Sequence, residues 1–108
     1  MAQNFRRYTA NDVGTSPATL FTADSYDTVV GISLANATTA QIIVSCYIND
    51  GVNDIHLIKD APIPAGSALQ VLDGGAKFVV QSGDALKVVS DTATSLDVWV
   101  STVDDISA

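Results

Sequence analysis

The sequence predicts an all-β fold, namely an antiparallel two-sheet sandwich that is jelly-roll-like and has about 8–9 short strands. Three observations predict it. All twelve acidic residues are Asp and none is Glu, and Asp favours turns and caps whereas Glu favours helices. Apolar residues recur with a period of two in several runs, which is the spacing of strands with one buried face. Turn-forming residues separate these runs at short intervals.

The N-terminal third of the chain alternates least clearly. It predicts two weak strands, at residues 4–9 and 19–23. We therefore expect residues 1–17 to form an N-terminal arm or a loose first strand, and residues 18–108 to form the sandwich domain.

The segment 1–17 is basic in a chain that is otherwise acidic. Arg6 and Arg7 are two of only five basic residues, and Phe5 and Tyr8 flank them. In the arm hypothesis these four side chains bind an acidic neighbouring subunit, with the rings as anchors and the arginines forming charge-assisted hydrogen bonds. In the alternative, the segment is an ordinary first strand whose arginines offset nearby aspartates.

Two longer runs predict the strands that follow. In residues 28–36 one face holds Val30, Ile32 and Leu34. In residues 41–49 one face holds Ile42, Val44, Cys46 and Ile48. Because Cys46 is the single cysteine, an internal disulfide is excluded, and its inward parity predicts that it packs as a small apolar group.

The segment NDGVND, residues 49–54, predicts a hairpin turn. Gly51 follows Asp50 and takes the positive φ that such a turn requires. Four of the six side chains carry oxygen, which also suits calcium, although no Glu is present to complete an EF-hand loop. An Asx-rich hairpin and a calcium loop both remain open. The next strand, residues 52–59, places Ile55 and Leu57 on one side.

The segment DAPIPAG, residues 60–66, predicts a crossing from one sheet to the other, because proline cannot donate to a strand ladder. Three short strands follow at residues 69–72, 77–81 and 86–90, and a last strand runs over residues 95–103. The residues expected to form the turns in this half of the chain are Pro62, Pro64, Gly66, Gly74, Gly75, Gly83 and Asp84.

Several apolar side chains have the parity of an outward face. In the last strand Leu96, Val98 and Val100 share one face, which leaves Trp99 and Val103 on the other. The same alternation turns further residues outward, namely Ile43, Tyr47, Val79 and Val89. These are either scattered exposed apolar residues, which are normal, or a sheet face that a neighbouring subunit covers.

Composition argues against several classes of function. A net charge of −7 with five basic residues disfavours nucleic acid as a partner. No apolar run approaches the roughly 20 residues of a membrane span, and no signal peptide is visible, so we expect that the chain is made in a cytoplasm and stays there or is assembled there into something larger. His56 is the only histidine and is expected on a strand surface. No catalytic residue, metal site or cofactor is predicted.

The segment "LIKDAPIPAGSALQVLDGGAKFVVQSGDALKVVSDTATSLDVWVS" resembles a recurrent segment in small structural proteins of tailed bacteriophages, including those of marine cyanobacteria. The shared pattern is Pro-x-Pro-x-Gly, strand, Gly-Gly, strand, Gly-Asp, strand, a Ser/Thr-rich turn and a final strand. Upstream, "VGTSPATLFTA" followed by "VVGISLANAT" is similar to the first half of such proteins.

The resemblance implies a non-enzymatic virion protein, with capsid decoration or cement as the leading role and a tail, neck or fibre role as the alternative. It implies a location in the virion, multicopy or homo-oligomeric assembly, and other virion proteins, capsid or tail subunits, as partners. A carbohydrate-binding sandwich that contacts the host surface is a separate alternative, in which Trp99, Tyr47 or Tyr26 would stack on sugar rings.

Overall fold

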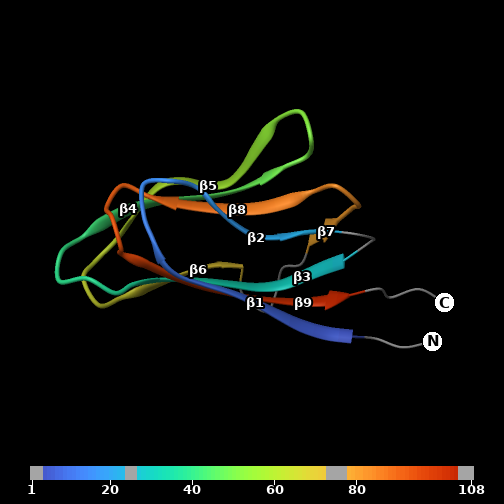
Figure 1. Cartoon of the computed structure of the whole chain (residues 1–108). Coiled ribbons are helices and arrows are strands. Elements are labelled where there is room, and N and C mark those ends of the chain that lie inside the picture. The colour runs from blue at the N-terminus through green and yellow to red at the C-terminus, as the bar shows by residue number, and fades with distance from the viewer. Residues whose placement is uncertain (1–3, 24–26, 73–77, 105–108) are drawn as a thin grey trace.

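The fold is known from a computed structural model, which describes residues 4–23, 27–72 and 78–104 (Figure 1). These residues form nine strands in two antiparallel sheets that pack face to face. The described residues contain no helix, and hence none that is long and apolar enough to cross a membrane. The predicted all-β sandwich and its strand number are confirmed.

Sheet 1 contains the first and last strands of the chain. In spatial order its strands are β1 (Asn4–Val13), β9 (Leu96–Asp104), β3 (Asp27–Asn36) and β6 (Ala68–Leu72), with β7 (Phe78–Val80) also paired to β3. Strand β1 is therefore one edge of this sheet.

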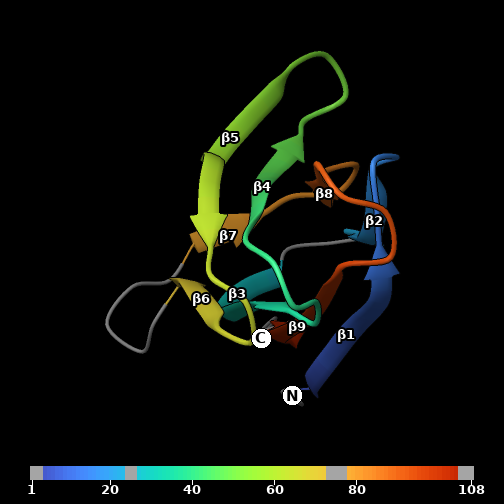
Figure 2. The same ribbon diagram turned by 90° about the vertical axis from the view of Figure 1, so that its left-hand side faces the viewer.

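Sheet 2 covers the inner face of sheet 1. In spatial order its strands are β2 (Ala18–Thr22), β8 (Ala85–Ser90), β4 (Ile42–Asn49) and β5 (Asp54–Ile63). The loop end of the β4–β5 hairpin stands away from the rest of the molecule (Figure 2).

The strand pairs are nested along the chain. Strand β1 pairs with β9, β2 with β8, β3 with β6, and β4 with β5. The two strands of the outermost pair are separated by nearly the whole length of the sequence, with Asn4 opposite Asp104. Sequence-distant segments must therefore meet before either sheet is complete.

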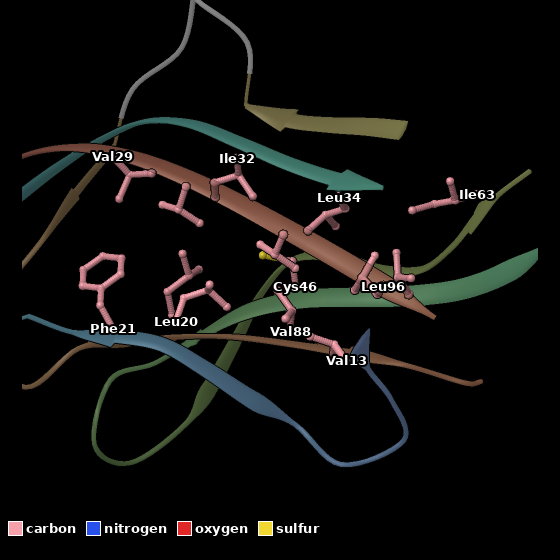
Figure 3. Packing of buried hydrophobic residues seen from close by; sticks show 14 of the residues in the cluster. Val13, Leu20, Phe21, Val29, Ile32, Leu34, Cys46, Ile63, Val88 and Leu96 are labelled. Atoms are coloured by element: carbon pink, nitrogen blue, oxygen red, sulfur yellow. The ribbon is translucent and has the colours of Figure 1, made fainter. Parts of the chain in front are cut away.

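The core lies between the two sheets and is made of aliphatic side chains with one aromatic ring at its edge (Figure 3). The expected inward sets of β9 and β4 are buried apart from Ile48, which is partly buried, and Leu96, Val100 and Cys46 are each 0% exposed. Burial in this apolar environment raises the pKa of the Cys46 thiol to about 12.

The inward face of β3 differs from the expectation. Val29, not Val30, is the buried valine of this strand. The register with β9 shifts between Val29 and Gly31, so one extra residue reverses the alternation at that point. Val30 turns outward as a result, while Ile32 stays buried as predicted.

Strand β5 also differs from the expectation, since it begins at Asp54 and continues to Ile63. Pro62 pairs with Ile43 inside the strand. A proline fits there because β5 is the edge of sheet 2 and needs no ladder donor on its outer side. The crossing to sheet 1 is thus confined to residues 64–67.

Candidate interaction surfaces

The outer face of sheet 1 carries a row of residues in register across four strands. The row consists of Phe5 on β1, Val103 on β9, Thr28 on β3 and Val79 on β7. Phe5 is 77% exposed and Val79 62% exposed. Exposed apolar side chains therefore lie at both ends of this row, with the partly exposed Thr28 and Val103 between them.

Trp99 extends this apolar surface along β9, and its side chain is 53% exposed. The Arg7 guanidinium lies over the indole, 5.4 Å from the ring centroid, which is a cation–π distance. A shallow depression lies between Trp99 and Phe5, and Val30 and Ser101 contribute to its lining.

The middle of this face is hollowed where a glycine carries no side chain. Gly31 is the β9-facing partner of Ser101, and a Cβ atom added at Gly31 would meet only the Ser101 Cβ, at 3.9 Å. The absent side chain therefore leaves room on the surface. We name this surface the outer patch and define it as Phe5, Arg7, Val30, Val79, Trp99 and Val103.

The segment predicted as an arm or first strand is paired in the structure, since residues 4–10 lie in continuous register with β9. Phe5 and Tyr8 lie on opposite faces of β1. Tyr8 points inward and stacks on Phe21 of β2, with ring centroids 4.5 Å apart and planes inclined by 18°. Arg6 is exposed, on the opposite face from Arg7. Binding of this segment to a neighbouring subunit stays a prediction.

Tyr47 lies on sheet 2, away from the other residues expected to bind a partner. It is only 8% exposed, and its ring centroid is 5.0 Å from that of exposed His56 on β5. Desolvation raises the pKa of Tyr47, and the charge of Asp54 adds to the shift. The structure thus gathers Phe5, Arg7, Trp99 and Val103 but not Tyr47.

A second apolar surface lies at the protruding end of the β4–β5 hairpin. Val52 is 85% exposed, Ile55 52% and Leu57 37%. We name these three residues the hairpin patch. The sequence placed Ile55 and Leu57 on one side of a strand, but the pairing with β4 shifts between Ile58 and His56, so Leu57 is an extra residue that breaks the alternation. The alternation also did not indicate that these side chains would be exposed. The polar residues that surround them were the available signal.

The hairpin loop uses its oxygen atoms internally. Asp50 Oδ1 accepts hydrogen bonds from the backbone N–H groups of Asn53 and Val52, at 2.7 and 3.0 Å. These bonds lower the pKa of Asp50. Asn49 Oδ1 accepts from the Gly51 N–H at 2.9 Å, and Asn49 Nδ2 donates to Asp54 Oδ1 at 2.7 Å. Among the described residues, no group of three or more His, Cys, Asp or Glu could hold a metal.

Three of the glycines that were expected to form turns have positive φ angles, and hydrogen bonds are formed in two of these turns. Gly51, Gly66 and Gly83 have φ angles of 96°, 70° and 96°. The Ser67 N–H donates to the Pro64 carbonyl at 3.1 Å, and Asp84 Oδ2 accepts from the Gln81 N–H at 2.8 Å. Gly74 and Gly75 lie outside the described residues, as does Tyr26.

Comparison with known proteins shows that this chain is similar to some of them in its fold. No family model and no curated protein matches the sequence. Among solved structures, the chain is similar to a protein of the T13 IBDV viral particle, with a TM-score of 0.59 and 14% identity. That match covers 94% of this chain and 31% of the other, so the chain spans about a third of the length of that protein.

Two further structures share the fold. One is a protein of Bacillus endospore appendages, described as disulfide-linked pili, with a TM-score of 0.55, 14% identity, and coverage of 94% of this chain and 84% of the other. The other is a pentameric capsid protein isolated from metagenomic phage sequences, with a TM-score of 0.50, 15% identity, and coverage of 94% and 60%. At such identities the likeness concerns the fold alone.

Proposed function

We propose that this chain is a non-enzymatic structural subunit of a virus particle that works by packing against other subunits. The observation that carries the proposal is the nested order of the strand pairs. The outermost pair joins the first and last strands, and the innermost pair joins β4 and β5. We assign this order to the jelly-roll architecture, which recurs in viral capsid domains. The similarity to the IBDV and phage capsid structures supports the same assignment.

Within the particle, we assign the chain to capsid decoration or cement, with a tail, neck or fibre position as the alternative. The grounds are its small size and the two separate apolar patches, which give one domain more than one contact surface. An origin in tailed bacteriophages, such as those of marine cyanobacteria, rests on the sequence pattern around Pro62, Pro64 and Gly83.

The similarity to the Bacillus appendage protein suggests a pilus-like role, and one feature of this chain disfavours it. Those pili are described as disulfide-linked. The single cysteine of this chain, Cys46, is 0% exposed and its thiol pKa is raised to about 12. A buried, protonated thiol cannot link two folded subunits.

Carbohydrate binding is the second candidate, because Trp99 is exposed beside a depression lined partly by Thr9, Asn11 and Asp97. An aromatic ring with polar neighbours suits a sugar. The guanidinium of Arg7, however, already lies over the ring. A glycan array separates the candidates, since binding that is lost in Trp99→Ala would favour the carbohydrate role.

The proposed function is tested by adding the purified chain to capsids that lack it and, separately, to isolated tails. Saturable binding to capsids, with the chain's density located on the shell of the reconstructed particle, is the expected result. Binding to tails alone would move the chain to the tail. Binding to neither would overturn the virion role.

A further inference from the structure

All the large hydrophobic side chains that are exposed among the described residues belong to two surfaces. Phe5, Val79 and Trp99 lie in the outer patch, and Val52, Ile55 and Leu57 form the hairpin patch. Exposed apolar groups gathered in this way mark interaction sites more often than scattered ones do. The outer patch belongs to sheet 1 and the hairpin patch to the free end of sheet 2. The two patches of a single copy therefore do not contact each other.

We propose that copies of this chain assemble head to tail, with the hairpin patch of one copy docked on the outer patch of the next. The inference rests on the proposed structural role and specifies a partner for it, namely a second copy of the chain. Self-association of the isolated chain can be measured without any virus particle.

The shapes of the two patches fit this arrangement. The outer patch is hollowed between Phe5 and Trp99, where Gly31 contributes no side chain beside Ser101. The hairpin stands away from its own sandwich (Figure 2), so its tip can reach a neighbour without a clash between the two bodies. A branched side chain such as that of Ile55 is of the size that fills a shallow depression of this kind.

Charge selects the head-to-tail arrangement over the symmetric ones. Arg7 lies within the outer patch, over Trp99, while Asp50 and Asp54 flank the hairpin patch. The backbone hydrogen bonds from Asn53 and Val52 lower the pKa of Asp50 and so favour its charged form. Docking outer patch on outer patch would bring Arg7 against its own copy, and docking hairpin on hairpin would oppose the aspartates.

One described acid of the outer face, Asp97, lies at the opposite end of Trp99 from Phe5. Its Oδ1 accepts a hydrogen bond from the Asp12 N–H at 3.2 Å. Because the contact joins two different surfaces, it is heterologous and generates either a closed ring or an open filament.

Two single variants each remove one half of the contact. Gly31→Leu fills the depression, and the sandwich should tolerate it because Gly31 has no positive φ and an added Cβ would meet only the Ser101 Cβ, at 3.9 Å. Ile55→Asp places a charge in the hairpin patch. Matched controls at exposed sites outside both patches are Thr19→Leu for bulk and Thr39→Asp for charge. Circular dichroism and thermal melting verify that all four variants fold.

Sedimentation velocity over a concentration series is the readout. We expect the parent chain and both controls to form assemblies larger than dimers as concentration rises, and each patch variant alone to remain monomeric. An equimolar mixture of Gly31→Leu and Ile55→Asp should form a dimer and nothing larger, because the first supplies an intact hairpin and the second an intact outer patch.

The proposal is overturned if the parent chain is still monomeric at concentrations on the order of 1 mM. It is equally overturned if a folded patch variant still assembles, if a control loses assembly, or if the mixture gives no dimer. Failure of capsid binding with normal self-association would instead count against the proposed function alone.

Discussion

Gly66 and Gly83 show how single residues set this fold, since each reverses the chain where β-branched residues cannot. Their φ angles are 70° and 96°, in the left-handed region, and a Cβ atom would meet nothing within 4 Å at either site. The requirement is therefore one of backbone conformation and not of space.

We expect Gly66→Val and Gly83→Val each to lower the free energy of unfolding by about 1–3 kcal/mol through backbone strain. Chemical denaturation measures the change. Gly31→Ala is the control, because its φ is not positive and its Cβ would sit in ordinary contact at 3.9 Å. Unchanged stability in both Val variants would show that these turns adopt another conformation in solution.

Cys46 gives the fold a pH-dependent term at alkaline pH. Desolvation raises its pKa from 9.0 to about 12, so the unfolded chain loses this proton at a lower pH than the folded chain does. The contribution of Cys46 is full below pH 9 and is lost as the pH rises toward 12. We expect the parent chain to lose more stability over this interval than Cys46→Ala does.

Urea titrations at pH 8 and at about pH 10.5 measure this difference, and comparison with the variant removes the contributions of tyrosines and lysines, which also titrate there. Equal losses in both proteins would contradict the prediction. A thiol reagent supplies a second measurement, because Cys46 should react only as fast as the chain opens.

At the scale of the elements, period-two alternation predicted most strands because one face of each sheet is buried. It worked in β9 and β4, because the extra residues of the register shifts lie on their partner strands and leave Leu96 and Val100, and Val44 and Cys46, buried. It failed in β3, where the shift between Val29 and Gly31 exchanges the buried valine. A bulge depends on the register of the partner strand, which is set by tertiary pairing that the local pattern does not contain.

The candidate site was predictable to a smaller extent. Parity placed Trp99 and Val103 on an outward face, but the position of Phe5 on that same face depends on the pairing of β1 with β9. That pairing joins the two ends of the chain and leaves no local signal. The exposure of Ile55 was indicated only by the polar residues around it, because it follows from how far the β4–β5 hairpin extends from the rest of the molecule.

Strand β1 has a testable part in stability. It covers the edge of β9 and places Tyr8 on Phe21 of the opposite sheet, with ring centroids 4.5 Å apart. Deleting residues 2–10 should expose the β9 edge and part of the core, and should therefore unfold the domain or lower its melting temperature strongly. Thermal melting followed by circular dichroism measures this.

The same deletion distinguishes the two interpretations of the N-terminal segment. A melting temperature that stays unchanged while assembly is lost would support the arm hypothesis. For a milder comparison, Phe5→Ser removes an exposed ring, whereas Tyr8→Ser removes an inward one. We expect only the Tyr8 variant to lower the melting temperature.

For the molecule as a whole, the nested pairing closes the sandwich by joining its termini-bearing strands, β1 and β9, in one sheet. Interleaved pairing of this kind couples the strands to one another, so the domain is expected to unfold as one unit. The outward faces are then fixed relative to each other. A rigid body with two unlike patches is what a repeating assembly needs, since any internal flexibility would blur the angle between successive copies.

The pairing of charges across the contact between copies can be tested by exchange. Arg7→Asp should abolish assembly, because it removes the positive charge over Trp99 and sets an acid against the aspartates of the neighbouring hairpin. Asp54→Lys by itself should also weaken assembly, because it sets a positive charge on the hairpin against Arg7 of the neighbouring copy. With both changes in one chain, the introduced acid faces the introduced lysine across the contact while Asp50 stays acidic, so assembly should return in part.

Lys87→Asp is the matched control, since it makes the same change of charge on β8 of sheet 2, outside both patches. Sedimentation at low and high salt provides the readout, and the restored assembly should weaken as salt screens the exchanged pair. If the double variant stays as monomeric as Arg7→Asp, the hairpin and the outer patch do not meet through these charges. If Lys87→Asp disrupts assembly equally, net charge and not the pairing of patches governs association.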